Sequence, residues 1–294
     1  MGLSQDIASS IAASSASSVT RDLTGLGGGG GLDPYAIAGA VAQNVYLPVQ
    51  QLSGQDIKFE DISVAADGLR LWACGKRLTT GRVWQFDLSV AWDLSTAVLS
   101  YTWASSGVAE PNFVSVSSDG SHIAVVDGSN ATNIKIWPLT VAGDLSGGVG
   151  TLTQGAKLAG STYSGGLNND GSQIYISQGR QYSYAMDPAY DASTVSATQV
   201  VFDSEGGVGP GIGCTGAAFS QDGTHMYLYG YEGEPRLWSF TLNIPWDPTG
   251  GSTPLDYLVL PSTGRGLAFS STHRKAFICF NATASVSCRE YVLP

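Results

Sequence analysis

The stretch AAFSQDGTHMYLY, from Ala217 to Tyr229, contains the pattern that repeats along the chain: small or apolar residues, an Asp-Gly turn, and a strand-like run. The pattern returns as ISVAADGLRLWAC from Ile62, VSVSSDGSHIAVV from Val114 and GGLNNDGSQIYIS from Gly165. A fifth copy, LAFSSTHRKAFIC from Leu267, has Thr272-His273 in place of Asp-Gly. The turn positions are 52, 51, 52 and 50 residues apart: Asp67, Asp119, Asp170, Asp222 and Thr272. Such a regular step indicates an internal repeat of about 51 residues, a period typical of propellers and other arrays.

Each repeat predicts four short strands. The third residue before the turn is always apolar, and the fourth before it is always small: Ser63, Ser115, Gly166, Ala218 and Ala268. Small residues are expected on the innermost strand of a propeller blade, because the inner strands of all blades lie close together around the central channel. Runs such as IAVV after Asp119 are apolar at successive positions, as in strands packed on both faces. A third strand such as RVWQFDL (82–88) and a fourth such as AVLSYTW (97–103) follow.

The sequence therefore predicts an all-β fold, a five-bladed β-propeller with four-stranded blades, over residues 44–294. The last repeat stops at Pro294, directly after its third strand. A spare strand-like segment, NVYLPVQQL at 44–52, precedes the first inner strand. We expect this segment to complete the last blade, because pairing the first and last strands removes the open edge of the ring.

Residues 1–43 differ from the rest and predict an extended or partly helical N-terminal anchoring arm. Apolar residues at helical spacing form a thin stripe and are the candidate partner-binding residues: Leu3, Ile7, Ile11, Val19, Leu23 and Leu26. Such a stripe buries too little area to fold alone but enough to dock on a partner. The glycine run 27–31 ends without Gly-Lys-Ser or Gly-Lys-Thr, so it favours a flexible linker over a phosphate loop. Residues 35–43 are interpreted as a short helix or a tether.

Composition narrows the class of partner. The net charge is −10 with only 14 Lys and Arg, which argues against nucleic acid and against anionic membrane surfaces as partners.

No apolar run approaches the 18 residues needed to span a bilayer. The first residues lack a basic start and an apolar region, so we expect no signal peptide and synthesis in the cytoplasm. The four cysteines (Cys74, Cys214, Cys279, Cys288) show no CxxC spacing and favour reduced, buried thiols, with a Cys279–Cys288 bridge left open.

The search for chemistry predicts no catalytic residue, no cofactor and no metal site. His122, His225 and His273 lie beside the repeat turns, and two of them share one repeat position, which favours a structural role. NNDGS at 168–172 lacks the acidic spacing of a calcium loop, and no G-x-S-x-G elbow is present. Trp92, Tyr190 and Trp246 share one loop position. They are candidate ligand-contact residues that could stack on a sugar, but a contact locking neighbouring blades is the favoured interpretation.

FSQDG followed by LWSFTL and PWDPTG resembles the propeller repeats of the WD-repeat and YVTN type. The variant AWDLSTA (91–97) is similar to repeats of predicted virion proteins of tailed bacteriophages, and the resemblance covers about residues 44–294. It implies a non-enzymatic structural or appendage protein of a virion, such as a tail or head fibre, adaptor or decoration. The arm would bind other virion proteins, the chain would be a homo-oligomer in the particle, and the propeller would be displayed for attachment to host-surface glycans.

Two alternatives stay open, because propellers support many functions. A carbohydrate-binding propeller lectin would need equivalent exposed pockets between blades, which the repeated loops allow. A propeller hydrolase or lactonase would need carboxylates, Asn or His converging on the central channel. The small residues of the inner strands offer none of these groups.

Overall fold

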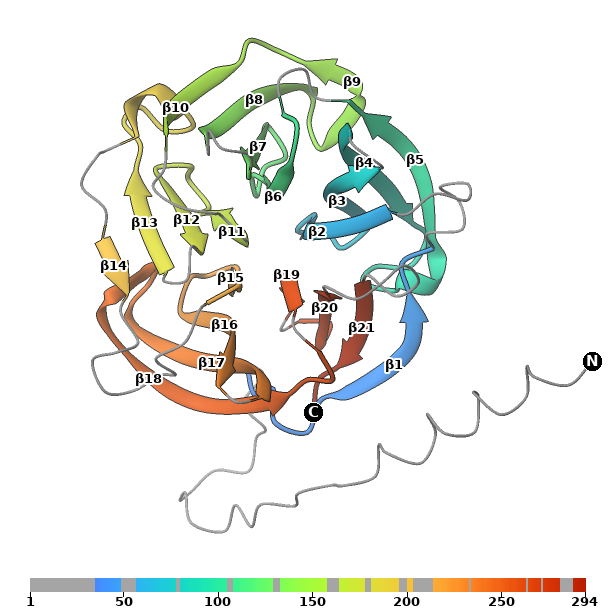
Figure 1. Ribbon diagram of the computed structural model, residues 1–294, viewed down its shortest axis with the longest axis vertical. Coiled ribbons are helices and arrows are strands. Elements are labelled where there is room, and N and C mark those ends of the chain that lie inside the picture. The colour runs from blue at the N-terminus through green and yellow to red at the C-terminus, as the bar shows by residue number, and fades with distance from the viewer. Residues whose placement is uncertain are drawn as a thin grey trace, which may run out of the picture. The chain divides into compact units, whose positions relative to one another are not determined.

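The computed structural model describes residues 35–48, 57–77, 80–104, 108–128, 133–157, 164–177, 181–195, 200–202, 214–232, 234–262, 264–270, 272–280 and 288–294. They form five antiparallel sheets arranged in a ring (Figure 1), which confirms the predicted five-bladed propeller. The candidate anchor residues, Leu3 to Leu26, lie outside the described residues. Within the described part of the chain, no helix is long and apolar enough to span a membrane.

Each blade runs outward from an inner strand beside the central channel. Blade 1 contains β2 (Ile57–Val64), β3 (Arg70–Arg77), β4 (Thr80–Leu88) and β5 (Ala97–Trp103). Blade 2 contains β6 (Pro111–Val116), β7 (His122–Asp127) and β8 (Asn133–Val141), with β9 (Asp144–Val149) and β10 (Thr153–Lys157) both paired to β8. Blade 3 contains β11 (Ser164–Leu167), β12 (Gln173–Ser177), β13 (Gln181–Ala185) and β14 (Val200–Phe202).

Blade 4 contains β15 (Gly216–Phe219), β16 (His225–Glu232), β17 (Glu234–Ile244) and β18 (Asp247–Val259). Blade 5 contains β19 (Gly264–Ser270), β20 (Lys275–Phe280), β21 (Cys288–Val292) and β1 (Val41–Tyr46). Two short 3-10 helices, η2 (Leu94–Thr96) and η3 (Ala192–Thr194), lie in the loops before the fourth strands of blades 1 and 3.

The hydrophobic cores lie between neighbouring blades. Ile123 to Val126 of β7 are all fully buried, as successive apolar residues are when both faces of a strand are covered. Trp72 of blade 1 and Val114 and Trp137 of blade 2 belong to one such core. Burial of apolar area between blades is therefore the main force that holds the ring together.

The ring closes through β1, the fourth strand of blade 5. β1 pairs antiparallel with β21, with Val41 opposite Val292 and Ala42 opposite Tyr291. The Arg289 guanidinium donates to the Gln43 carbonyl over 2.8 Å, which adds a side-chain contact to this pairing. Closure by an N-terminal strand is as expected, but the strand spans 41–46 instead of 44–52.

The earlier start of β1 has a cause in the residues before it. Residues 35–41, YAIAGAV, match WDLSTAV at 92–98. In blade 1 this stretch consists of the loop at 92–96 and the first two residues of β5. Ile37 is fully buried, as Leu94 is at the equivalent position. The segment 35–40 is therefore neither a helix nor a tether: it is the loop between the third and fourth strands of blade 5. The compact unit accordingly begins at Asp33.

The fifth turn departs from the others where its sequence does. In the other four turns the glycine after Asp has positive φ, for example +72° at Gly223, whereas in the fifth turn Arg274 takes this conformation with φ 51°. The backbone N–H of His273 donates to the Ser270 hydroxyl over 3.1 Å. Loss of Asp-Gly thus shifts the left-handed residue by one position and keeps the hairpin.

The cysteines are buried thiols, as predicted. Cys279 and Cys288 are directly opposite each other in β20 and β21. Burial, followed by the neighbouring Cys288 thiol, raises the pKa of Cys279 well above its usual value. The reactive thiolate form is therefore disfavoured in the folded protein.

Candidate functional site at the turn face

One face of the ring, here called the turn face, carries the turns between first and second strands and the loops between third and fourth strands. The Asp of each Asp-Gly turn holds the turn together. Asp119 Oδ1, for example, accepts from the Ser121 backbone N–H over 2.9 Å and from its hydroxyl over 2.7 Å. Partial burial of Asp222 acts against ionisation, but hydrogen bonds from Ser220, Thr224 and Tyr35 outweigh it and lower its pKa to about 2. These carboxylates serve the hairpin turns, as predicted for NNDGS.

In three blades the Asp-Gly turn is followed by a loop with an aromatic residue before an Asp: Trp92, Tyr190 and Trp246. Trp92, Tyr190 and Trp246 have φ of 57°, 61° and 63°, a left-handed conformation that is rare for bulky residues. The Trp246 backbone N–H donates to the Gly223 carbonyl over 2.9 Å. Its ring lies on Gly223, where an added methyl group would overlap the indole. Glycine is required there because its hydrogen is the only substituent that leaves room for the ring.

The same loops also contact the preceding blade, and we call each of these contacts a joint. Tyr190 of blade 3 stacks on His122 of blade 2, with ring centroids 4.2 Å apart. Trp92 of blade 1 lies against Phe277 of blade 5, with ring centroids 5.1 Å apart. The candidate ligand-contact residues Trp92 and Tyr190 therefore form contacts between blades, which was the favoured interpretation. Two of them, Trp92 and Trp246, also line the central cavity described below.

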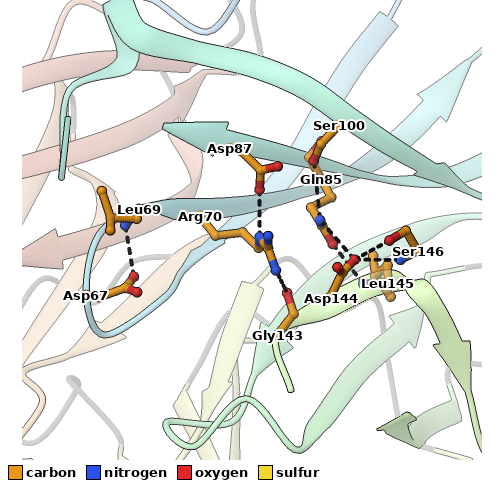
Figure 2. A network of polar contacts seen from close by, with 10 residues as sticks. All are labelled: Asp67, Leu69, Arg70, Gln85, Asp87, Ser100, Gly143, Asp144, Leu145 and Ser146. Atoms are coloured by element: carbon orange, nitrogen blue, oxygen red, sulfur yellow. Dashed lines mark hydrogen bonds and ion pairs between the residues drawn. The ribbon is translucent and has the colours of Figure 1, made fainter. Parts of the chain in front are cut away.

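In the joint between blades 1 and 2 the loop has no aromatic side chain, because Gly143 stands at that position. Polar side chains take its place (Figure 2). The Arg70 guanidinium donates to the Gly143 carbonyl over 2.7 Å and to Asp87 Oδ1 over 2.6 Å. Gln85 Oε1 accepts from the Leu145 backbone N–H over 2.8 Å. The third residue after the first turn residue is polar in every repeat: Arg70, His122, Gln173, His225 and Lys275. At Arg70 and His122 this residue forms part of a joint.

The histidines do not converge. His122 and His225 occupy equivalent joints in blades 2 and 4, and His273 lies beside the fifth turn, 6.2 Å from Trp92 between ring centroids. Among the described residues, no group of three or more His, Cys, Asp and Glu side chains is placed to hold a metal ion.

A cavity of about 240 Å³ opens at the centre of the turn face. Its wall consists of the ends of the five inner strands and the turns that follow them, with Trp92 and Trp246 at the margin. The small residues predicted for the inner strands line it: Ser63, Ser115, Gly166, Ala218 and Ala268. Among its described lining residues, His273 is the only ionisable side chain.

Asp61 of β2 is a buried carboxyl next to this wall. Its Oδ1 accepts from the Ser164 hydroxyl over 3.2 Å, a bond from blade 3 to blade 1, and its Oδ2 accepts from the Val114 backbone N–H over 3.2 Å. Burial raises the pKa of Asp61 well above its usual value, although these hydrogen bonds oppose the shift. Sequence reasoning missed Asp61, even though the acidic pair in the apolar run IKFEDISV (57–64) was a readable signal.

No protein-family model and no curated protein matches the chain. Among solved structures, the chain is similar to the β-propeller domain of Cps50 (Swd1) from Myceliophteria thermophila, with TM-score 0.45, 13% identity and coverage of 75% of this chain and 62% of that one. It is similar to the periplasmic gluconolactonase PpgL of Pseudomonas aeruginosa, with TM-score 0.46, 17% identity and coverage of 74% and 64%. A functionally unknown protein from Desulfotomaculum acetoxidans gives TM-score 0.46, 11% identity and coverage of 78% and 69%. The chain thus spans less than two thirds of the first two neighbours, and the likeness is one of fold.

Proposed function

We propose that the chain is a non-catalytic structural protein of a phage particle. Residues 1–31 attach it to other virion proteins, and the propeller is displayed with its turn face available to the host surface. The observation that carries the proposal is the completeness of the ring from Tyr35 onward. Loop 35–40 and β1 supply the last missing parts of blade 5, so the segment before Tyr35 is not needed to build a blade.

The apolar stripe of the arm supports attachment. Ordering such a segment on a partner costs roughly 1 to 2 kcal/mol per backbone residue, so several apolar contacts or several copies of the chain are required. The carboxylates of the turn face support a structural role, because they are used for hydrogen bonds within the protein. The carboxylates of the Asp-Gly turns are bonded within their hairpins, and Asp61 is bonded to blades 2 and 3. The virion assignment itself rests on the resemblance of the repeats.

The test is incorporation of tagged variants into phage particles assembled in the host cell. Ile7→Asp with Ile11→Asp places two charges on the apolar stripe and should abolish incorporation, while circular dichroism and thermal melting stay as in the unchanged chain. Ser9→Asp with Ala13→Asp is the matched control, because it adds the same charges at the same spacing on the opposite face of a helix. Full incorporation of the first variant would move the attachment site to the propeller. Failure of the unchanged chain to enter any particle would overturn the virion assignment.

A further inference from the structure

We propose that the central cavity of the turn face binds an uncharged, polyhydroxylated ligand of the size of one neutral sugar unit. The cavity belongs to the ring itself, so this proposal is independent of how the chain is attached to a particle. It also differs from a lectin site between blades, because one cavity at the axis of the ring is shared by all five inner strands.

The size of the cavity limits the ligand to one small ring. Its volume of about 240 Å³ lies below the usual range of small-molecule pockets, roughly 300 to 1,000 Å³. Its lining includes both serine hydroxyls and apolar side chains, as in sites where a few polar groups orient a ligand. A single sugar unit at the end of a glycan fits this size, with the rest of the glycan extending into solvent.

Two serines place hydrogen-bond donors in the wall. Ser63 Oγ accepts from the Val116 backbone N–H over 3.2 Å, and Ser115 Oγ accepts from the Leu167 backbone N–H over 3.1 Å. These bonds between neighbouring blades fix both oxygens, and each hydroxyl keeps its hydrogen to donate. In the described part of the chain, neither hydroxyl hydrogen has a protein acceptor. Sugar hydroxyls can accept these hydrogens, because a hydroxyl is donor and acceptor at once.

The described wall of the cavity has no permanently charged side chain that could compensate a bound ion. The described lining residues include no Asp, Glu, Lys or Arg, and His273 is the one ionisable side chain among them. A carboxylate or phosphate buried without a permanent cation loses its hydration without compensation. A cation has no carboxylate in the wall to pair with. An uncharged ligand is therefore the class that this lining selects.

The rim is held rigid before any ligand arrives. The Ser118 hydroxyl donates to the Asn169 carbonyl over 3.0 Å, and the Asn169 amide donates to the Gln221 carbonyl, so that the bonds run across blades 2, 3 and 4. The lining residues Trp92 and Trp246 are fixed by backbone hydrogen bonds to the Gly68 and Gly223 carbonyls of their own blades, over 3.0 and 2.9 Å. A preformed site binds with a smaller loss of conformational entropy than a mobile one.

Gly166 provides a clean way to fill the cavity. It lines the wall, its backbone does not have the positive φ that disfavours side chains, and a Cβ placed on it meets no atom within 4 Å. Gly166→Leu should therefore place a branched side chain in the cavity and leave the blade intact. Val98→Leu on the exposed outer strand β5 is the control for a change in side-chain size far from the cavity.

The experiment has two arms with the full chain. An array of neutral and acidic glycans is probed first, and the methyl glycosides of glucose, galactose, mannose and N-acetylglucosamine are then titrated by calorimetry. We expect binding to neutral glycans and to at least one glycoside. Gly166→Leu should weaken it at least tenfold with an unchanged melting temperature, and Ser63→Ala with Ser115→Ala should weaken it as well. Val98→Leu should bind like the unchanged chain.

Three results would overturn the proposal: no binding to any neutral glycan or glycoside, binding confined to acidic glycans or to peptides, or neutral-glycan binding that Gly166→Leu leaves unchanged. Incorporation of Gly166→Leu into particles should be normal. The cavity proposal and the virion proposal therefore fail separately.

Discussion

Tyr35 stacks on His225 with ring centroids 3.7 Å apart and planes inclined by 12°, in the same relation as Tyr190 to His122 in another joint of the ring. The Tyr35 hydroxyl also donates to Asp222 Oδ2 over 3.0 Å, and the Ile37 backbone N–H donates to Asp256 Oδ2 over 2.9 Å. The first described residues of the chain thus form the joint between blades 4 and 5.

This equivalence predicts equal costs for two distant substitutions. Tyr35→Ala and Tyr190→Ala each remove an aromatic stack and buried area at a joint, so each should lower the free energy of unfolding by about 1 to 3 kcal/mol. Urea unfolding followed by tryptophan fluorescence measures both. Tyr101→Ala on the outer strand β5 is the control and should have little effect. A neutral Tyr35→Ala beside a costly Tyr190→Ala would show that residues 35–40 do not form a joint.

The glycine under each loop aromatic gives a second prediction. Gly223→Ala should lower the free energy of unfolding by at least about 2 kcal/mol, because it strains a backbone with φ of +72° and overlaps the Trp246 ring. Gly166→Ala has neither problem and is the matched control, with an expected effect within about 0.5 kcal/mol. Equal effects of the two substitutions would contradict the packing described for the loop.

Asp61 predicts a dependence of stability on pH above pH 4. Its pKa is raised in the folded state, so the folded protein holds a proton that the unfolded chain releases near its ordinary pKa of about 3.9. Its contribution to stability is therefore full below about pH 4 and is lost as the pH rises through the folded pKa. Asp61→Asn removes this dependence. As the pH rises from 4 to 7, the urea midpoint of the variant should rise relative to that of the unchanged chain. A difference between the two midpoints that stays constant over this range would contradict the raised pKa.

Asp222 predicts the opposite trend at lower pH. Its folded pKa of about 2 lies below the unfolded value, so its contribution is present above about pH 4 and is lost as the pH falls toward 2. Asp222→Asn should therefore be less stable than the unchanged chain at pH 7. The difference should shrink between pH 4 and pH 2 in thermal melts. A difference that does not change with pH would mean that the loss comes from geometry rather than from the charge.

The repeat made the fold predictable, because four Asp-Gly turns at an even spacing set the number of blades and the place of the inner strands. The role of Trp92, Tyr190 and Trp246 could be favoured for the same reason, since a position that recurs in several blades is explained by contacts that also recur. The partner of each loop could not be predicted. It lies in the preceding blade, about 70 residues earlier for the loops of blades 2, 3 and 4, and only the closed ring brings the two together.

The start of the ring was placed too late because the fifth loop lacks the residues that mark the others. Ala36 stands where other loops have Asp, and Tyr35 stands where two have Trp. Ala40-Val41 still match Ala97-Val98, but two residues are too few to be found without the structure. Asp61 could not be predicted from the pattern that the five inner strands share, because its carboxyl occurs in one blade and does not recur in the others. Attachment through Leu3 to Leu26 stays a prediction.

The account depends most on closure of the ring by residues 35–46. The most direct measurement compares the urea unfolding of chains that lack residues 1–31 and residues 1–46. The first should keep the midpoint and cooperativity of the full chain, because Tyr35, Ile37 and β1 remain. The second exposes the edge of β21 and opens the joint at His225, so it should unfold at lower urea with a smaller slope or aggregate. Equal stability of the two truncated chains, or loss of cooperative unfolding in the first, would contradict the account.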